Sequence, residues 1–247
     1  MSTPSRKQPA DAPVNDQVGG AELRSFGRRR GRKLSARQKL LMTELLPRVA
    51  VPLSDPPPAE LADWFPEPVS RVWLEIGFGG GEHLVAQARA NPSVGLIGCE
   101  VFEEGVVKVL AVLDDTSIPN IRLCNEDARA LLRHLPAGSL EKVFILFPDP
   151  WPKKRHVKRR LIAPPLLAEL ARALAPGGEL RIATDIGDYL RTILMSFRGQ
   201  PAFQWQVSGP ADWREQGADW PKTRYQAKAV REGRRCYFLR FRHAGRP

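Results

Sequence analysis

The sequence predicts an α/β fold in which a mostly parallel sheet is covered by helices on both faces. Apolar, strand-like runs alternate five times with segments of helical spacing between residues 71 and 198, and two later strand-like runs could pair antiparallel. The chain has 247 residues, of which 43% are hydrophobic, so it can bury the core of one large domain. We find no internal repeat.

The composition divides the chain into three parts. Residues 1–33 form a basic arm whose first part is rich in Pro, Ala, Ser and Asp. This composition buries too little apolar surface to offset the entropy of ordering, so we expect the arm to be disordered. Residues 34–70 form a helical and proline-rich lead-in, in which Ser35 caps a short helix with Gln38 at the capping-box position. Residues 71–247 form the α/β domain.

A glycine-rich turn follows the first predicted strand. The apolar run 72–76 leads into Gly77, Gly79 and Gly81, and a helical pattern follows. Glycines permit positive φ and let a ligand approach the backbone. The spacing departs from the dinucleotide fingerprint, whose third glycine comes one residue later. Glu75 would repel a diphosphate but could face a cationic group, which favours a cofactor that carries an amino acid over NAD.

Two further acids follow predicted strands. Glu100 lies 23 residues after Gly77, near the offset at which an acid accepts hydrogen bonds from ribose hydroxyls. Asp127 is placed to accept a hydrogen from an adenine amino group. Either acid could instead cap the helix that follows it. The elements here are expected at 94–100 (strand), 102–113 (helix), 121–124 (strand) and 128–135 (helix).

The fourth predicted strand, 143–147, runs into Pro148-Asp149-Pro150. Proline fixes its own φ and restricts the residue before it, so Asp149 should lie on a stiff loop at the carboxyl end of a strand. Open α/β sheets bind their ligands there. A run of cations follows, which suggests chemistry on a nucleic acid, although a proline turn before a solvated basic helix is the simpler alternative. The cations are Lys153, Lys154, Arg155, Lys158, Arg159 and Arg160.

The remaining elements complete the sheet. A helix over 161–175 is expected to end at Pro176-Gly177-Gly178, because proline and glycine terminate helices. The later elements are the strand 179–183 before Thr184-Asp185, the helix 187–198 and the strand 235–241.

The net charge of +11 indicates an anionic partner, with nucleic acid as the first candidate. The arm could lie along phosphates, or it could merely solubilise the chain. No apolar run approaches the roughly 18 residues of a membrane span, and the N-terminus lacks the apolar core of a signal peptide, so we expect a cytoplasmic protein. Cys99, Cys124 and Cys236 lack metal-site spacing, and the four histidines form no ligand pattern, which predicts reduced core thiols and no metal.

These features together resemble class I S-adenosylmethionine-dependent methyltransferases: the segment Glu75–Gly81, the later acids, and the Pro-Gly-Gly before a strand. More narrowly, residues 24–242 resemble the bacterial TrmB family of tRNA (guanine-N7-)-methyltransferases. The most specific segments are Phe147–His156, Arg28–Arg32 and Ala183–Asp185. The resemblance implies a seven-stranded Rossmann-like sheet, S-adenosyl-L-methionine as cofactor, and a tRNA substrate methylated at guanine 46. It leaves open whether the protein is a monomer or a homodimer.

The resemblance also implies roles for individual residues. The family's catalytic aspartate matches Asp149, and its cofactor contacts match Glu75, Glu100, Asp127 and Asp149, to which the glycine turn adds Gly77, Gly79 and Gly81. Substrate contacts match Lys153, Asp185, Thr223, Arg224, Tyr225 and Gln226. The last four depart from the usual Thr-Lys-Phe-Glu, because Gln226 lacks the carboxylate. The expected RNA contacts are Arg28, Arg29, Arg30, Arg32, Lys154, Arg155, His156, Lys158, Arg159 and Arg160.

The implied chemistry is methyl transfer from a sulfonium to guanine N7. This nitrogen has an in-plane lone pair and no proton to lose, so no general base is required and positioning should dominate. Asp149 could stabilise the charge that develops on the purine or accept hydrogen bonds from guanine, and the sequence leaves both roles open. A methyltransferase for another RNA base is the closest alternative. A noncatalytic RNA-binding protein would not need the three acids, and a small-molecule methyltransferase would not need the cations.

Overall fold

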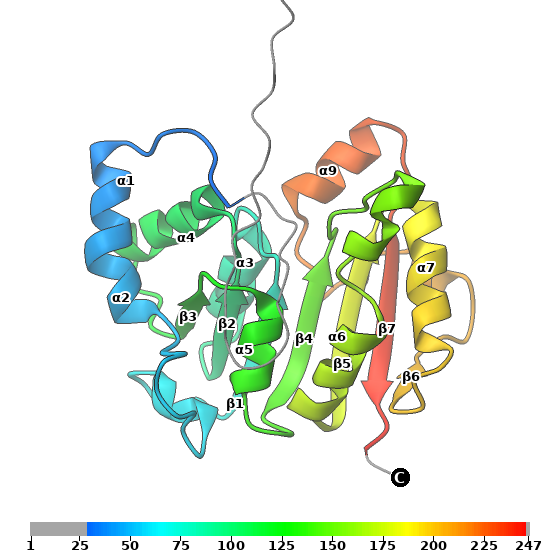
Figure 1. The fold of residues 1–247 in the computed structure, drawn as a ribbon, viewed down its shortest axis with the longest axis horizontal. Coiled ribbons are helices and arrows are strands. Elements are labelled where there is room, and N and C mark those ends of the chain that lie inside the picture. Colours follow the sequence, from blue (N-terminus) through cyan, green and yellow to red (C-terminus); the bar gives the residue numbers. More distant parts are fainter. Residues whose placement is uncertain (1–28, 246–247) are drawn as a thin grey trace, which may run out of the picture.

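Residues 29–245, which the computed structural model describes, contain a seven-stranded sheet with helices on both faces (Figure 1). The strands are β1 (Arg71–Ile76), β2 (Val94–Cys99), β3 (Ile121–Cys124), β4 (Leu140–Leu146), β5 (Leu174–Thr184), β6 (Phe203–Trp205) and β7 (Tyr237–His243). Their order is β3-β2-β1-β4-β5-β7-β6, in which β7 is antiparallel to both of its neighbours and the other pairs are parallel. The predicted fold class is therefore confirmed.

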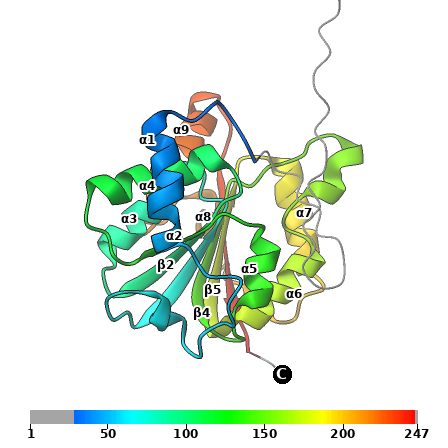
Figure 2. The same ribbon diagram turned by 60° about the vertical axis from the view of Figure 1, so that its left-hand side comes forward.

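The main helices form two layers, one on each side of the sheet (Figure 2). One layer contains α3 (Glu82–Ala90) and α4 (Glu103–Asp115), and the other contains α5 (Ala128–His134), α6 (Pro164–Ala173) and α7 (Gly187–Phe197). The shorter helical segments are α1 (Ala36–Leu40), η1 (Leu41–Leu45), α2 (Leu46–Val49), η2 (Leu61–Trp64), η3 (Lys154–Arg159), α8 (Ala211–Arg214) and α9 (Arg224–Arg231).

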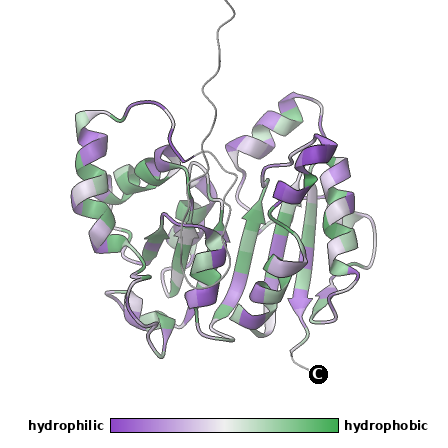
Figure 3. Ribbon diagram, viewed as in Figure 1, coloured by the Kyte–Doolittle hydropathy of each residue, from purple (hydrophilic) through white to green (hydrophobic). Residues whose placement is uncertain are grey.

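Side chains of the central strands alternate between the two layers. In β4, Val143 and Ile145 pack in the apolar cluster that includes α5, α6 and α7, whereas Phe144 and Leu146 pack in the cluster with α3 and α4. Because both faces are buried, such a strand is a continuous apolar run in the sequence. Figure 3 shows hydrophobic residues along the strands and hydrophilic residues on α9.

The lead-in packs on the same side as α4. Ser35 caps α1 as predicted: its Oγ accepts a hydrogen bond from the backbone N–H of Gln38, and the Gln38 side chain accepts one from the backbone N–H of Ser35. Leu41 is buried in the cluster with α4. The chain then runs beside β3, where the Val51 N–H donates to the carbonyl of Leu123 at 2.8 Å.

The predicted end of the helix after the cation run is wrong. α6 ends at Ala173, and Pro176-Gly177-Gly178 lies inside β5, which begins at Leu174. Leu174 is 1% exposed and pairs with Leu140 of β4. The register then shifts before Lys142, and this irregularity accommodates the proline and the glycines. Tertiary pairing of a buried leucine thus overrides the local stop signal.

The structure also bears on the predicted state of the cysteines and on membrane-spanning helices. Cys99, Cys124 and Cys236 are buried free thiols, as predicted. Among the helices of residues 29–245, none has the length and apolar character that crossing a membrane requires.

Candidate functional site

The turn after β1 places its glycines in the left-handed region of backbone space. Gly77, Gly79 and Gly81 have φ values of 73°, 57° and 79°, which side chains with a Cβ rarely adopt. A Cβ added to Gly77 would meet no atom of the described chain within 4 Å. At Gly81 it would lie 2.2 Å from Val109 of α4. Gly77 therefore borders open space, whereas Gly81 lets α4 approach the turn.

The open space is a cavity of about 510 Å³ at the carboxyl ends of β1, β2, β3 and β4. It lies where the strand order reverses, because β1 neighbours both β2 and β4. Such a switch point is where open α/β sheets bind ligands. Of the predicted cofactor residues, the cavity is lined by Gly77, Gly79, Glu100, Asp127 and Asp149.

Glu100 fastens the glycine turn to the start of α4. Its Oε2 accepts a hydrogen bond from the N–H of Gly79, and its Oε1 accepts one from the N–H of Phe102, each at 2.9 Å. Burial raises the pKa of Glu100, and the backbone donors oppose that shift. Phe102 is the N-cap residue of α4, and no side chain caps that helix, so Glu100 holds the residue before the helix and does not cap it.

Asp127 caps α5 and also lines the cavity. Its Oδ1 accepts from the backbone N–H of Arg129 at 2.9 Å, and its two oxygens bind the Arg129 guanidinium at 2.8 and 2.7 Å. Burial alone would raise the pKa of Asp127, but the hydrogen bonds from Arg129 outweigh it, so the pKa is lowered. The alternative that Asp127 caps the following helix is therefore confirmed, and its role toward a cofactor stays a prediction.

The loop after β4 holds two strained residues. Phe147 and Trp151 have φ values of 52° and 41° although neither is glycine. Such conformations persist where surrounding contacts determine them, and they cluster at functional sites. Here the N–H of Phe147 donates to the carbonyl of Ala183 at 2.8 Å, and the guanidinium of Arg159 lies 5.0 Å from the Trp151 ring.

Asp149 lies between these strained residues and borders the cavity. Its side chain makes no hydrogen bond or ion pair within residues 29–245. It is exposed to solvent at the cavity mouth, yet the surrounding walls desolvate it enough to raise its pKa. The loop therefore presents a carboxylate whose charge no nearby cation of the described chain neutralises.

The cation run divides into exposed and buried members. Lys153, Lys154, Arg155 and Lys158 are exposed, and Lys158 and Arg159 border the cavity. Arg160 is 5% exposed. Its Nε donates to the carbonyl of Pro150 at 2.8 Å, and its terminal nitrogens bind Thr192 and Asp188 of α7. This placement contradicts the predicted RNA contact of Arg160, which instead ties the Asp149 loop to α7, because the chain turns inward after η3.

The comparisons with known proteins agree on a family. A family described as "Putative methyltransferase" matches residues 70–239. A protein of Rhodospirillum rubrum named tRNA (guanine-N(7)-)-methyltransferase is 52% identical over 91% of this chain and 89% of its own. A Rhizobium meliloti protein of the same name is 46% identical over 89% of this chain and 94% of its own. The chain belongs to the tRNA (guanine-N(7)-)-methyltransferase family.

Solved structures support the fold of this tRNA (guanine-N(7)-)-methyltransferase family member. The antibiotic-resistance methyltransferase Kmr matches with a TM-score of 0.51 at 20% identity, over 72% of this chain and 89% of that one. The 16S rRNA methyltransferase KamB matches with a TM-score of 0.51 at 16% identity, over 71% of this chain and 88% of that one. At this identity the likeness concerns the fold alone.

The substrate residues implied by the family resemblance are only partly brought to the cavity. Arg224 and Tyr225, at the start of α9, line it, and Tyr225 packs on the glycine turn, because a Cβ on Gly79 would lie 2.9 Å from its Cε2. Asp185 instead pairs with Arg234 at 2.7 Å. Thr223 caps α9, because its side chain accepts a hydrogen bond from the Gln226 N–H at 3.2 Å. The Gln226 side chain donates to Gln216 at 2.6 Å. Lys153 is absent from the cavity wall that the described residues form.

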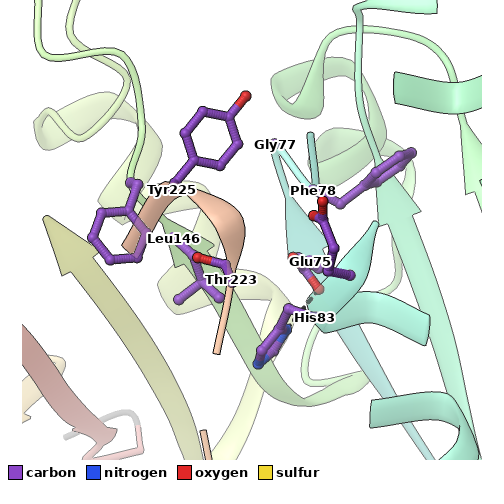
Figure 4. A pocket seen from close by; sticks show the side chains of 9 residues that line it. Glu75, Gly77, Phe78, His83, Leu146, Thr223 and Tyr225 are labelled. Carbon is purple, nitrogen blue, oxygen red and sulfur yellow. Dashed lines mark hydrogen bonds and ion pairs between the residues drawn. The ribbon is translucent and has the colours of Figure 1, made fainter. Parts of the chain in front are cut away.

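Glu75 is buried beneath the cavity and not part of its wall. His83 Nδ1 lies 2.8 Å from Glu75 Oε2, and both side chains are at most 3% exposed. Figure 4 shows this pair on one side of a small hollow of about 10 Å³, roughly the size of one water molecule. On the other side lie Leu146, Thr223 and Tyr225.

Several partners were missed by sequence reasoning. They are His83, Arg129 and Arg234, which bind Glu75, Asp127 and Asp185. A signal existed for Arg129, since it follows the expected cap by two residues. Arg234 offered none, because it is 49 residues from Asp185.

The last residues of the basic arm, from Arg29 on, belong to the part of the chain that the structure describes. Arg28 lies outside the described residues. The carbonyl of Arg29 accepts from the N–H of Glu103 at 2.9 Å, and the Arg29 side chain reaches Glu126 at 3.3 Å. Arg30 reaches Glu103 at 3.4 Å and is 87% exposed. The end of the arm therefore lies along the start of α4, beside the cavity.

Proposed function

We propose that this protein transfers a methyl group from S-adenosyl-L-methionine to N7 of guanine 46 in the variable loop of tRNA. The observation that carries the proposal is Asp149, a carboxylate without a partner in residues 29–245, held by a strained loop at the cavity mouth. The exposed cations of η3 begin five residues later, at Lys154. The names of the two curated relatives support guanine N7 in tRNA as the acceptor.

The cavity suits the cofactor in size and chemistry. Its volume of about 510 Å³ lies within the range of small-molecule sites, roughly 300–1,000 Å³. Within residues 29–245, Glu100 accepts one hydrogen bond on each oxygen from the backbone of Gly79 and Phe102, and the N–H of Val101 also acts on it, so part of its acceptor capacity remains for a ribose hydroxyl. Asp127 Oδ2 accepts a single hydrogen bond from the part of the chain that the structure describes, so it can take a second from an adenine amino group. When bound, the cofactor supplies the methyl group on a sulfonium.

Asp149 acts on the guanine in this proposal. Its carboxylate stabilises the positive charge that the purine gains, and it accepts hydrogen bonds from the Watson–Crick donors that distinguish guanine from adenine. The walls that raise its pKa also strengthen these interactions, because they exclude part of the solvent. The strained loop holds the carboxylate in place before the substrate arrives.

The test is methyl transfer to an unmodified tRNA transcript, with tritium on the methyl group and analysis of the modified nucleosides. A transcript with adenine at position 46 is the matched control. We expect 7-methylguanosine from the first transcript and none from the second. Methylation of a different nucleoside would replace the proposal by a methyltransferase of another RNA base. Absence of transfer would refute it.

A further inference from the structure

α9 carries a row of cations on one side. Arg224, Lys228 and Arg231 occupy positions i, i+4 and i+7 of this helix, so they share one face. All three are exposed, and Ala229 alone among the residues of α9 is buried. The row is about 10 Å long, because an α-helix rises about 1.5 Å per residue.

Contacts within the described chain use only part of the charge of this row. Lys228 and Arg231 make no hydrogen bond or ion pair within the described chain, and the neighbouring Glu232 is paired with a different arginine. Arg224 reaches Glu82 at 3.4 Å, but both side chains are largely exposed. Like charges three and four residues apart destabilise a helix. Lys228 and Arg231 also lie in the last turn of α9, where cations favour the helix dipole, and both attract the nearby Glu232 carboxylate. Their side chains nevertheless stay exposed without a bonded partner in the described chain, so the row is open to an anion outside the protein.

The row begins at the cavity and extends away from it. Arg224 and Tyr225 border the cavity from α9, and Lys158 and Arg159 border it from η3. α9 lies at the end of the molecule to which the parallel strands point, and it carries hydrophilic residues between apolar ones (Figures 1 and 3). Exposed cations from two elements thus border the same mouth.

We propose that the row on α9 binds backbone phosphates of tRNA, so that the RNA is held by η3 and α9 together while a nucleotide enters the cavity between them. This inference rests on the proposed function. RNA fits better than an acidic protein surface, because the row adjoins Tyr225, an aromatic side chain that is 45% exposed. Cations that follow a backbone beside an exposed ring are typical of single-stranded RNA binding.

The test compares two double variants that each remove two positive charges. Lys228→Ala with Arg231→Ala removes the part of the row outside the cavity wall. Arg89→Ala with Arg198→Ala is the matched control: both arginines are exposed, Arg89 lies in the last turn of α3, and Arg198 comes directly after α7, so both lie away from the cavity. Binding of tRNA is measured by fluorescence anisotropy across a salt series, with the demethylated cofactor product present so that no methyl transfer occurs.

We expect the α9 variant to lower the slope of log affinity against log salt by about two units, one for each phosphate contact. Its affinity at low salt should fall about tenfold or more. The control should keep the wild-type slope. Circular dichroism should show both variants folded, because alanine favours helix and none of the four side chains is buried.

Two results would overturn the inference. An unchanged slope in the α9 variant would remove the row from the interface, and an equal loss in both variants would mean that net charge alone governs binding. Its failure is distinct from failure of the proposed function. If the predicted slopes appear but the wild-type protein forms no 7-methylguanosine, the surface stands and the proposed function fails.

Discussion

Arg160→Ala should release the Asp149 loop while leaving the sheet intact. Arg160 is 5% exposed, and it joins the carbonyl of Pro150 to two side chains of α7. The loop that it holds contains two non-glycine residues with positive φ. Strained conformations relax when their supporting contacts are lost. We therefore expect the carboxylate to leave its productive position.

The loss of stability can be worked out from each contact. The charged hydrogen bond to Pro150 contributes about 1.5–3 kcal/mol. The Asp188 side chain is 71% exposed, so solvent screening leaves that ion pair worth about 1 kcal/mol or less. The guanidinium lies 4.9 Å from the Tyr189 ring, which adds about 0.5–2 kcal/mol. The sum of about 2–6 kcal/mol corresponds to a fall in Tm of roughly 4–24 °C for a chain of this size.

Turnover should fall more than cofactor affinity. A misplacement of about 1 Å can cost about 10²-fold in rate, and Asp149 directly precedes the anchored Pro150. We expect a kcat loss of about 10²-fold at temperatures where the variant is folded. Cofactor affinity should change little, because Glu100 and Gly77 are held by other contacts. Single-turnover methylation, calorimetric titration and thermal melting measure the three quantities.

Two control variants sharpen this test. Arg160→Lys keeps the charge but not the planar fork, so it should recover part of the stability and little of the turnover. Arg191→Ala removes an exposed arginine from the same helix and should change neither. If Arg160→Ala turns over at the wild-type rate while folded, Arg160 does not position the loop.

Three further changes test the site. Asp149→Asn should lower turnover about 10²-fold or more and leave tRNA affinity nearly unchanged, because phosphate contacts supply most of it. Since desolvation raises the pKa of Asp149, wild-type turnover should fall on acidification at a higher pH than it would with an aspartate of ordinary pKa, and Asp149→Asn should lack this fall. Glu100→Ala should weaken cofactor binding by roughly 1–3 kcal/mol in isothermal titration. Deleting residues 1–33 should lower the salt slope of tRNA binding and spare cofactor binding.

Each of these changes has an opposing outcome. Wild-type turnover in Asp149→Asn would leave its carboxylate with neither proposed role. If turnover of that variant still falls on acidification, the group that titrates is not Asp149. Unchanged titration in Glu100→Ala would remove Glu100 from the cofactor site, and an unchanged salt slope after the deletion would make the arm a passive tail.

The order of strands and helices could be predicted because burial leaves a direct trace in the sequence. The run 143–147 is apolar without interruption, since β4 packs against helices on both faces. The positions of Glu100 and Asp127 followed from the same logic, because acids after parallel strands collect at one edge of the sheet. Hydrophobic periodicity could not predict that Tyr225 lies at that edge, since Tyr225 belongs to a helix and is 41 residues beyond the end of β5.

Burial of a charged residue could not be predicted from charge. Lys158, Arg159 and Arg160 are consecutive cations with nothing in their composition to separate them. The structure exposes the first and buries the last, because the chain turns toward α6 after η3 and α7 supplies acceptors there. Those acceptors are 28 and 32 residues away. Long-range partners of this kind decide whether a cation faces solvent or the core, and the local sequence around the cation does not indicate them.

For the acids after β2 and β3, the sequence posed a choice between capping and ligand binding, and the hydrogen bonds that both carboxylates make within residues 29–245 leave acceptor sites for a ligand. A carboxylate has about four acceptor sites. Glu100 spends two of them on backbone N–H groups of Gly79 and Phe102, so its orientation is fixed without exhausting its capacity. Asp127 is likewise oriented by Arg129 and keeps a free site on Oδ2. A capped helix start is therefore a means of presenting a preoriented acceptor to a ligand, and capping geometry at a strand's carboxyl end should not be taken as evidence against binding.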